Sequence, residues 1–506
     1  MSCDQPIFEP INFFLNRPTS VRPYRDELPS LAVEDLDTEY SFAFNYANPS
    51  GVILLRGSAR DEVLDAVSSR ALESLTSLRQ DELSPTLRRL FRTQSQRVDA
   101  TLNYWIHVTD SCNLGCYYCY IDDVDRFQPS ARQAMTSDTA AIVLERVRSD
   151  ALTQGIRKIH FKFAGGEPLL AVKAVQQFCE LAEATLPSAE YAVSYGVITN
   201  GFSVSDDALD LIQKRDMNVS ISLDGHEELH DRTRYILQDG KRIGSWAQVC
   251  SNIENLQRKG VTSYVLHTVS PANIDGLDRL QNFLGAKGIG FRISLVRLGH
   301  LPSDSARQRF QDALVRFYTN LPDVFPLNLR IERDARFAEW NPSRSKQMAC
   351  GSARNYFSID SQGKLSSCQM AAARPLVDLK EGDIQMARQI ALARPDTKIL
   401  AAPNARTGGC TQCYFRATCA GGCPQHTLAA AGTMDHPSPW CGVYGALYPT
   451  YVRAIARHRL RVIRAFNINH KVKSTGFSRS ALAARICCMK GVRHGVQVRQ
   501  SYGVSN

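Results

Sequence analysis

Three cysteines in one short segment are the residues of this 506-residue chain best suited to chemistry. Cys112, Cys116 and Cys119 follow a C-x3-C-x2-C spacing. Three thiolates on one loop suit a 4Fe–4S cluster, whose fourth iron would then have no protein ligand. An open coordination position is where a metal centre can bind a reactant. Half of a zinc site, or a cluster that only transfers electrons, would use the same residues, so both alternatives stay open at this point.

The elements that must position this loop form a regular alternation. Strand-like runs cover residues 102–108, 158–163, 192–198, 219–223, 263–269 and 291–296. Helical patterns lie between them at residues 137–149, 171–184, 206–214, 245–259 and 277–287. This order predicts a parallel α/β sheet or an incomplete barrel. Chemistry in such folds collects at the carboxyl ends of the strands, and Cys112 follows the first of them.

Polar motifs follow the next strands. Gly165-Gly166-Glu167-Pro168 follows the second strand, Thr199-Asn200 ends the third, and Ser222 and Asp224 end the fourth. Glycines allow a ligand to approach the backbone closely, and the glutamate offers an acceptor for a cationic group. Hydroxyl, amide and carboxylate groups at successive strand ends suit recognition of a ribose and a carboxylate.

Together these motifs resemble those of the radical S-adenosylmethionine (SAM) enzymes. The resemblance implies a partial (β/α)6 barrel over residues 99–320. It also implies that SAM fills the open iron position of the cluster on Cys112, Cys116 and Cys119. SAM cleavage in that family yields a 5′-deoxyadenosyl radical, which takes a hydrogen atom from the substrate.

The same resemblance assigns further residues to the cofactor. An aromatic residue before the last cysteine lies near the adenine, and the Gly-Gly-Glu-Pro turn holds the amino group of SAM. The expected cofactor-binding residues are Tyr118, Gly165, Gly166, Glu167, Pro168, Thr199, Asn200, Ser222, Asp224 and Arg234. Ser222 is the expected ribose contact and Arg234 the expected partner of the SAM carboxylate, whereas Asp224 orders its loop. A purely structural role stays open for Ser222 and Thr199.

A second cysteine array occupies residues 345–445. Its members are Cys350, Cys368, Cys410, Cys413, Cys419, Cys423 and Cys441. The order resembles the SPASM domain, the auxiliary-cluster extension of radical SAM maturases, although Cys410-x2-Cys413 alone would also suit zinc. The resemblance assigns Cys410, Cys413, Cys419 and Cys441 to one auxiliary cluster and the other three cysteines to a second. It thus implies three 4Fe–4S clusters in all, the second auxiliary one with an open iron or a non-cysteine ligand.

The first hundred residues distinguish two functions. Residues 1–30 are a Pro-rich extension, and residues 31–98 show strand, turn, strand and helix signals of a small α+β domain. Many peptide maturases carry a winged-helix domain there that binds a leader peptide. We therefore expect a maturase that modifies a ribosomally made precursor peptide, most simply by a side-chain cross-link. The alternative enzyme is an anaerobic sulfatase maturase that makes formylglycine, and a cluster-bearing scaffold or electron carrier is the non-catalytic alternative.

The charge and hydropathy of the chain limit which partners and which cellular location are expected. The net charge of +10 comes from a tail: residues 453–506 hold twelve Lys and Arg and no acid, which leaves 48 basic against 50 acidic residues elsewhere. Nucleic acid is therefore not the expected partner. No apolar run reaches the length of a membrane span, and the first residues show no signal peptide, so we expect a cytoplasmic protein. A ferredoxin- or flavodoxin-type reductant is the expected electron donor. Residues 446–506 should form a helix and a basic tail.

Overall fold

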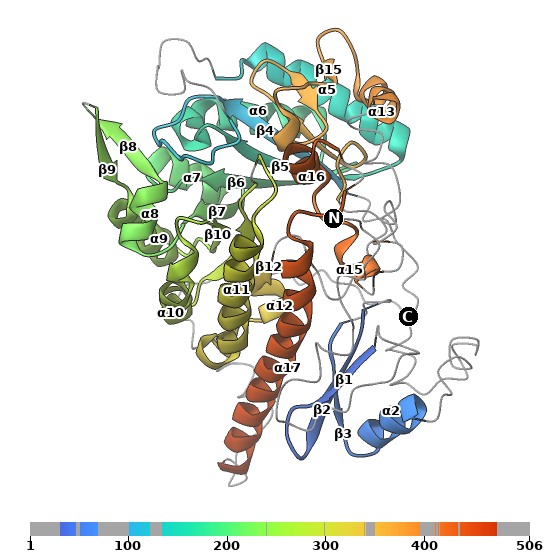
Figure 1. Cartoon of the computed structure of the whole chain (residues 1–506). Helices are drawn as coiled ribbons and strands as arrows, with labels where there is room; N and C mark the ends of the chain where they lie inside the picture. Colours follow the sequence, from blue (N-terminus) through green and yellow to red (C-terminus); the bar gives the residue numbers. More distant parts are fainter. Residues whose placement is uncertain are drawn as a thin grey trace. The chain divides into compact units, whose positions relative to one another are not determined.

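Ten strands between residues 101 and 378 form one sheet (Figure 1). The computed structural model describes residues 31–46, 51–68, 101–121, 134–238, 240–297, 299–337, 340, 350–394, 410, 413, 415–433 and 436–472. The strand order is β12-β11-β10-β7-β6-β5-β4-β13-β14-β15. The six strands from β4 to β11 in this sheet are parallel neighbours in chain order, which is the arrangement of a partial (β/α)6 barrel.

The six parallel strands alternate with helices, as the sequence predicts. The barrel elements are β4 (Thr101–Thr109), α5 (Ser137–Gln154), β5 (Lys158–Gly165), η2 (Pro168–Ala171), α6 (Val172–Thr185), β6 (Ala192–Thr199), α7 (Asp206–Lys214), β7 (Asn218–Ser222), α8 (Glu227–Thr233), α9 (Trp246–Arg258), β10 (Ser263–Val269), η3 (Ile274–Gly276), α10 (Leu277–Lys287) and β11 (Gly290–Leu295). Every predicted strand is confirmed to within two residues at each end. The hydroxyls of Thr136 and Ser205 cap α5 and α7, so local sequence fixes where these helices begin.

The sheet continues beyond the barrel at both edges. The strand β12 (Ala335–Phe337) pairs with β11, and β13 (Tyr356–Ile359) pairs in parallel with β4. Next to β13 lie β14 (Lys364–Ser366) and β15 (Val377–Asp378). The sequence pattern does not predict these strands, because two to four residues are too few to show an alternation. The cysteine-rich region is thus hydrogen-bonded to the first barrel strand.

The remaining elements lie outside the alternation. A two-stranded ribbon of β8 (Tyr235–Gln238) and β9 (Lys241–Gly244) projects from the barrel (Figure 1). After β11 come α11 (Asp304–Val324), α12 (Ile331–Asp334), η4 (Gln369–Ala371), α13 (Ile384–Ala393), α15 (Arg416–Cys419), α16 (Pro424–Ala431) and α17 (Cys441–Val472). The predicted C-terminal helix is therefore longer than residues 446–466. Met1–His458 form one compact unit and Arg459–Asn506 another, so α17 contributes to both.

The N-terminal part forms a small antiparallel sheet. It consists of β1 (Leu31–Asp35), β2 (Tyr40–Asn45) and β3 (Ile53–Arg56), followed by α2 (Ser58–Ser68). The sequence predicts β2, β3 and α2, but not β1; a further helical pattern at residues 81–92 lies outside the described residues. Arg453 of α17 binds the Glu34 carboxylate through two nitrogens, at 2.6 and 2.8 Å. This bidentate pair fastens β1 to α17.

A buried carboxylate ties the cysteine-rich region to the barrel. Asp150 of α5 accepts a hydrogen bond from the Tyr104 hydroxyl of β4 at 2.8 Å. It also accepts hydrogen bonds from Arg388 of α13, one of them at 2.9 Å. Only 1% of Asp150 is exposed, so the carboxylate depends on these donors for its solvation.

Replacing this carboxylate should destabilise the fold. We expect Asp150→Asn to lower the free energy of unfolding by about 3–5 kcal/mol, because it leaves the Arg388 charge buried without its counter-ion. The matched control is Asp323→Asn, which breaks the solvent-exposed pair with Arg457 and should cost less than about 1 kcal/mol. Urea denaturation of both variants measures the difference; equal losses would contradict a structural role for Asp150.

Candidate active site

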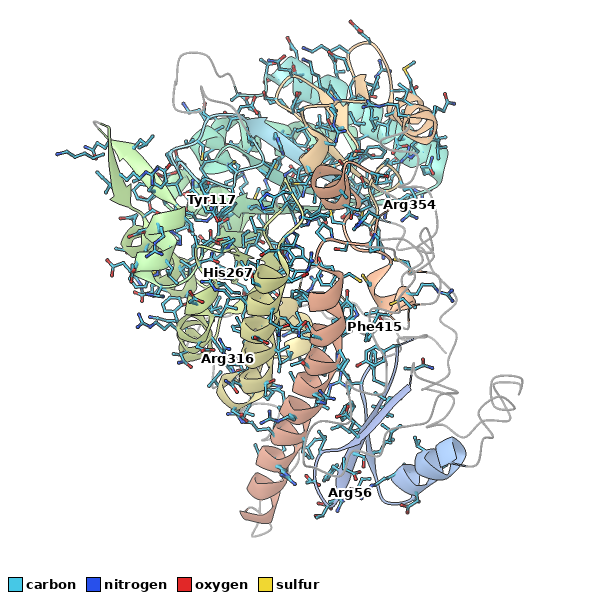
Figure 2. The ribbon with its side chains drawn as sticks, viewed as in Figure 1. Arg56, Tyr117, His267, Arg316, Arg354 and Phe415 are labelled. Atoms are coloured by element: carbon cyan, nitrogen blue, oxygen red, sulfur yellow. The ribbon has the colours of Figure 1, made fainter. Side chains whose placement is uncertain are left out.

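The cysteine loop lies at the carboxyl end of β4. Cys116 is buried, and the backbone around it is held by its own turn, in which Cys119 N–H donates to Cys116 O at 3.2 Å. Gly115 N–H donates to the carbonyl of Tyr235, the first residue of β8, at 2.7 Å. Tyr117 on this loop is half exposed and lies on the barrel side of the molecule (Figure 2). The loop is therefore held at its middle by β8 and towards its end by its own turn.

Gly165 and Gly166 bring the second strand end against this loop. Gly166 N–H donates to Thr109 O and Glu167 N–H to Ser111 O, each at 2.8 Å. A Cβ at Gly165 would lie 2.1 Å from Thr109 O, and a Cβ at Gly166 would lie 2.1 Å from Ser111 O. Only glycine permits this approach of two backbones. In this structure Gly165 lies against Thr109, the last residue of β4, and Gly166 lies against Ser111 of the cysteine loop.

Glu167 joins the ends of β5 and β6. Its Oε1 accepts from Leu169 N–H at 3.0 Å and from the Thr199 hydroxyl at 2.7 Å, and its Oε2 accepts from Asn200 N–H at 2.7 Å. The first bond caps η2, which begins at Pro168. Burial raises the pKa of Glu167 to about 7, although the three donors act in the opposite direction. Three of roughly four acceptor positions of this carboxylate are used by the chain.

Asn200 connects this strand end to the cysteine loop. Its Nδ2 donates to Asn113 Oδ1 at 2.7 Å and lies 3.8 Å from Cys112 Sγ. Its Oδ1 accepts from Phe202 N–H at 2.9 Å, which fixes the orientation of the amide. Asn113 in turn donates to the Ser203 hydroxyl at 3.1 Å. Sequence reasoning missed Asn113, whose position inside the cysteine motif was the available signal.

Asp224 is the centre of the third set of contacts. Its Oδ2 accepts from the Tyr118 hydroxyl and from Arg234 Nε, the latter at 2.7 Å. Its Oδ1 accepts from Thr268 N–H at 3.0 Å. Burial is the largest single influence and opposes ionisation, but the charges of Arg234, His267 and His230 and the hydrogen bond from Tyr118 together outweigh it, and so the pKa of Asp224 is lowered. His267 of β10 lies 3.7 Å away and is labelled in Figure 2.

Arg234 connects Asp224 to the cysteine loop. Its Nη1 lies 3.5 Å from Cys116 Sγ, and its guanidinium carbon lies 5.4 Å from the centre of the Tyr118 ring. Arg234 is 8% exposed. Cys116, Tyr118, Asp224 and Arg234 therefore form one contiguous group, although 118 residues separate the first from the last.

Two further residues complete the strand-end region. His230 accepts from Asp224 N–H at 3.1 Å and contacts the Ser245 hydroxyl at 2.9 Å, so it braces the Asp224 loop. Ser222, the last residue of β7, is partly exposed. Thr268 and Ser245 are contacts that the sequence does not reveal, because they are common residue types outside any motif.

The seven cysteines of the second array divide into two electrostatic groups. Burial, followed by the charges of Cys423 and Cys350, raises the pKa of the Cys368 thiol to about 12. Burial, followed by the charges of Cys419, Cys413 and Cys410, raises that of Cys441 to about 12. The cysteines that act on Cys368 and those that act on Cys441 are therefore different.

These thiols fit metal clusters. A buried thiol with a raised pKa stays protonated unless a cation takes the place of its proton, and iron supplies that charge. Burial also raises the pKa of Cys112 to about 12. No described group of three or more His, Cys, Asp or Glu side chains is close enough for a single metal ion. A four-iron cluster instead distributes its thiolates over separate irons.

The comparisons with known proteins agree with this arrangement. Residues 106–284 match the radical SAM superfamily. This part of the chain is a radical SAM domain. A radical SAM domain is an enzyme domain and implies a 4Fe–4S cluster and SAM as cofactors, and the C-terminal region of this chain is rich in cysteine. Among the described residues, none of the helices has the length and apolarity needed to span a bilayer.

Three curated proteins are similar in sequence. The cysteine-type anaerobic sulfatase-maturating enzyme of Clostridium novyi (strain NT) is 26% identical over 36% of this chain and 47% of its own length, so the chain spans about half of that relative. The serine-type enzyme of Klebsiella aerogenes is 26% identical over 66% of this chain and 81% of its own. The sporulation killing factor maturation protein SkfB of Bacillus subtilis (strain 168) is 23% identical over 34% and 36%.

A solved structure shares the fold. The structure described as native anSMEcpe with bound AdoMet aligns with a TM-score of 0.55 and 16% identity, over 72% of this chain and 99% of that one. At this identity the likeness concerns the fold alone. It confirms the radical SAM barrel that the order of the strands predicts.

The contact at Gly166 gives a test of the cysteine loop. We expect Gly166→Ala to push Ser111 away and to misplace the loop, with a loss of about four irons per chain from one cluster. The control is Gly299→Ala, because a methyl group there meets no atom within 4 Å. Iron and sulfide analysis after anaerobic reconstitution measures both variants; equal iron in both would show that the loop does not need this approach.

Proposed function

We propose that this protein is a radical SAM maturase that modifies a ribosomally synthesised precursor peptide, most simply by forming a side-chain cross-link. The observation that carries the proposal is the joining of Cys116, Tyr118, Asp224 and Arg234 at the carboxyl end of the barrel strands. It places a three-thiol loop beside polar strand ends, where a cofactor and a peptide can meet.

Cys112, Cys116 and Cys119 are the proposed ligands of the SAM cluster. When bound and reduced, that cluster cleaves SAM, and the resulting 5′-deoxyadenosyl radical abstracts a hydrogen atom from the substrate. Oε2 of Glu167 accepts one hydrogen bond from the chain and has room for a second, which supports a role in holding the amino group of SAM.

The remaining proposed SAM contacts differ in how many of their hydrogen-bonding groups the protein itself already uses. Ser222 is partly exposed at its strand end, and its hydroxyl suits a ribose. Arg234 is paired with Asp224, but Nε makes that bond, and a guanidinium has further donors for a carboxylate. Tyr118 is held through its hydroxyl and its ring faces Arg234 at 5.4 Å, and we propose that the remaining surface of the ring contacts the adenine. Thr199 and Asn200 orient Glu167 and the cysteine loop, and we propose them as positioning residues.

The second array is proposed to hold two auxiliary clusters, for three in all. Cys410, Cys413, Cys419 and Cys441 would hold one cluster with four thiolates. Cys350, Cys368 and Cys423 would hold the other, with one position for a further ligand. Phe415, between the cysteines of the first set, packs 5.4 Å from Tyr448 of α17 (Figure 2). That packing supports a rigid frame for electron transfer.

A peptide substrate is supported by the N-terminal sheet. Both β1 and β3 pair only with β2 among the described strands, so each keeps an outer edge that a leader peptide could extend. The three strands followed by α2 suit the proposed leader-recognition domain. Thr418 of α15 lies 3.4 Å from the carbonyl of Tyr46, so this sheet contacts the auxiliary-cluster region.

The second candidate is an anaerobic sulfatase maturase. Its support is the 26% identity to the Klebsiella aerogenes enzyme over 81% of that protein's length. Both candidates abstract hydrogen from a side chain of a peptide or protein. They differ in the substrate and in whether the product is a new bond or an aldehyde.

Mass spectrometry separates the two candidates. A short peptide encoded beside this gene should lose two hydrogens when it is produced together with the enzyme at low oxygen, and the loss should disappear in Cys112→Ala. Fragmentation then locates the bond. An unchanged peptide, together with a neighbouring sulfatase whose active-site Cys or Ser becomes formylglycine, would establish the second candidate instead.

Single cysteine variants should separate SAM cleavage from product formation. Cys116→Ala should abolish 5′-deoxyadenosine formation, because it removes a ligand of the SAM cluster. Cys413→Ala should keep some cleavage but lose product, because it disrupts an auxiliary cluster only. Chromatography of 5′-deoxyadenosine and product measures both. The matched control is Cys250→Ala, a buried helix residue outside both arrays.

Iron content bears on the same assignment. The fully loaded wild type should contain about 12 irons per chain, four for each of three clusters. A value near four would contradict the auxiliary clusters. Formation of 5′-deoxyadenosine by Cys116→Ala would contradict the assignment of the SAM cluster.

A further inference from the structure

A cavity lies beside the cysteine group that lacks a fourth cysteine. It has a volume of about 380 Å³ and is lined by residues from the loop after β11, from the segment after Cys368 and from α16. A cavity of this size can enclose a small group or one or two side chains of a ligand. Its polar lining residues are Arg297, Arg374, Gln425 and His426, and Met370 and Leu428 contribute apolar surface.

The lining carries at least two positive charges. Arg297 and Arg374 both contribute to it, and none of the described lining residues is acidic. Arg297 also hydrogen-bonds to Cys423 and lies near Cys368, so part of its charge serves these sulfurs. A cavity with this charge favours an anionic group over a neutral one.

Gln425 adds a directed donor. Arg374 donates to its Oε1 at 3.0 Å, which fixes which end of the amide is the oxygen. The opposite atom, Nε2, is buried and has no hydrogen-bond partner among the described residues. Gln425 is only 6% exposed, and an unmet donor at that depth is costly. A ligand group with two acceptor oxygens could accept hydrogen bonds from the amide and from the two guanidinium groups together.

We propose that this cavity binds a carboxylate of the peptide substrate, held by Arg297, Arg374 and Nε2 of Gln425. The inference rests on the proposed function for the identity of the ligand as a peptide. A carboxylate fits because guanidinium groups bind its two oxygens side by side, and the amide donor completes the set. Its source is an acidic side chain or the C-terminal carboxylate of the peptide.

The location gives the cavity a role in the reaction. Met370 follows Cys368 by two residues, and Gln425 follows Cys423 by two residues. A peptide anchored here is therefore held next to the Cys350, Cys368 and Cys423 group. Such an anchor away from the reacting atoms supplies binding energy that orients the residue to be modified.

Binding of small capped probes tests the proposal without requiring turnover. The probes are N-acetyl-glutamate methylamide for a side-chain carboxylate, N-acetyl-alanine for a terminal carboxylate, and N-acetyl-glutamine methylamide as the neutral match. Calorimetric titration of the cluster-loaded enzyme, kept anaerobic, gives the affinities. At least one carboxylate probe should bind about 10-fold more tightly than the neutral probe, and the tighter of the two identifies the source.

Two variants locate the binding. Arg374→Gln should remove the preference for the carboxylate, and Gln425→Leu should reduce it, since the first loses a charge and the second only the amide donor. The matched control is Arg394→Gln, an arginine of the same region that does not line the cavity and donates to Pro375 O. Iron content and circular dichroism equal to wild type show that each variant is folded and loaded.

The outcomes separate this inference from the proposed function. Equal affinity for charged and neutral probes in the wild type, or an unchanged preference in a folded Arg374→Gln, would overturn the carboxylate site while leaving SAM cleavage intact. Conversely, carboxylate binding that depends on Arg374 in a protein that never modifies a peptide would keep the site and overturn the proposed function.

Discussion

The buried pair of Asp224 and Arg234 is the constraint on which the candidate site depends. Removing two charges from water is expensive, and the pair is stable only because every partner is in place: the Tyr118 hydroxyl, Thr268 N–H and the Cys116 sulfur. The same contacts determine where the cysteine loop can lie. The end of β7, the loop that follows β4 and the Arg234 guanidinium beside Cys116 are thereby fixed to one another. Loops alone would not give this precision, so the ion pair supplies the preorganisation that a reactive centre needs.

Glycine performs the complementary task on the other side of the loop. At Gly165 and Gly166 the backbone at the end of β5 touches the backbone of Thr109, which ends β4, and of Ser111 in the loop, so no side chain separates them. Glu167, the next residue, is then forced into the interior, where it joins the ends of β5 and β6. The motif therefore combines two functions, because the residues that bring the loop close also position a carboxylate behind it. A ligand-binding role and a structural role are not alternatives for such residues.

The sequence predicts the barrel well because its signals are local. Apolar strands of five to nine residues and capped helices are visible in one dimension, and β10, α7 and α10 have the predicted bounds. The cysteine spacings likewise predict iron–sulfur clusters. The contacts of Asn113, Thr268 and Arg297 could not be predicted, since they arise from the meeting of distant segments. The strands β12 to β15 are missed for a related reason: a short edge strand is defined by its neighbour in the sheet, not by its own residues.

The pairing of β13 with β4 fixes the cysteine-rich region to the barrel. The first strand of the cysteine-rich region extends the same sheet that leads into the loop of Cys112, Cys116 and Cys119, and Asp150 and Arg388 reinforce that connection from the helix side. The relative position of the arrays is thus set by backbone hydrogen bonds and a buried ion pair, and a flexible linker between them would leave it undefined. Electron transfer and substrate anchoring both require such fixed distances. The continuous sheet makes the barrel and the cysteine-rich region one structural body.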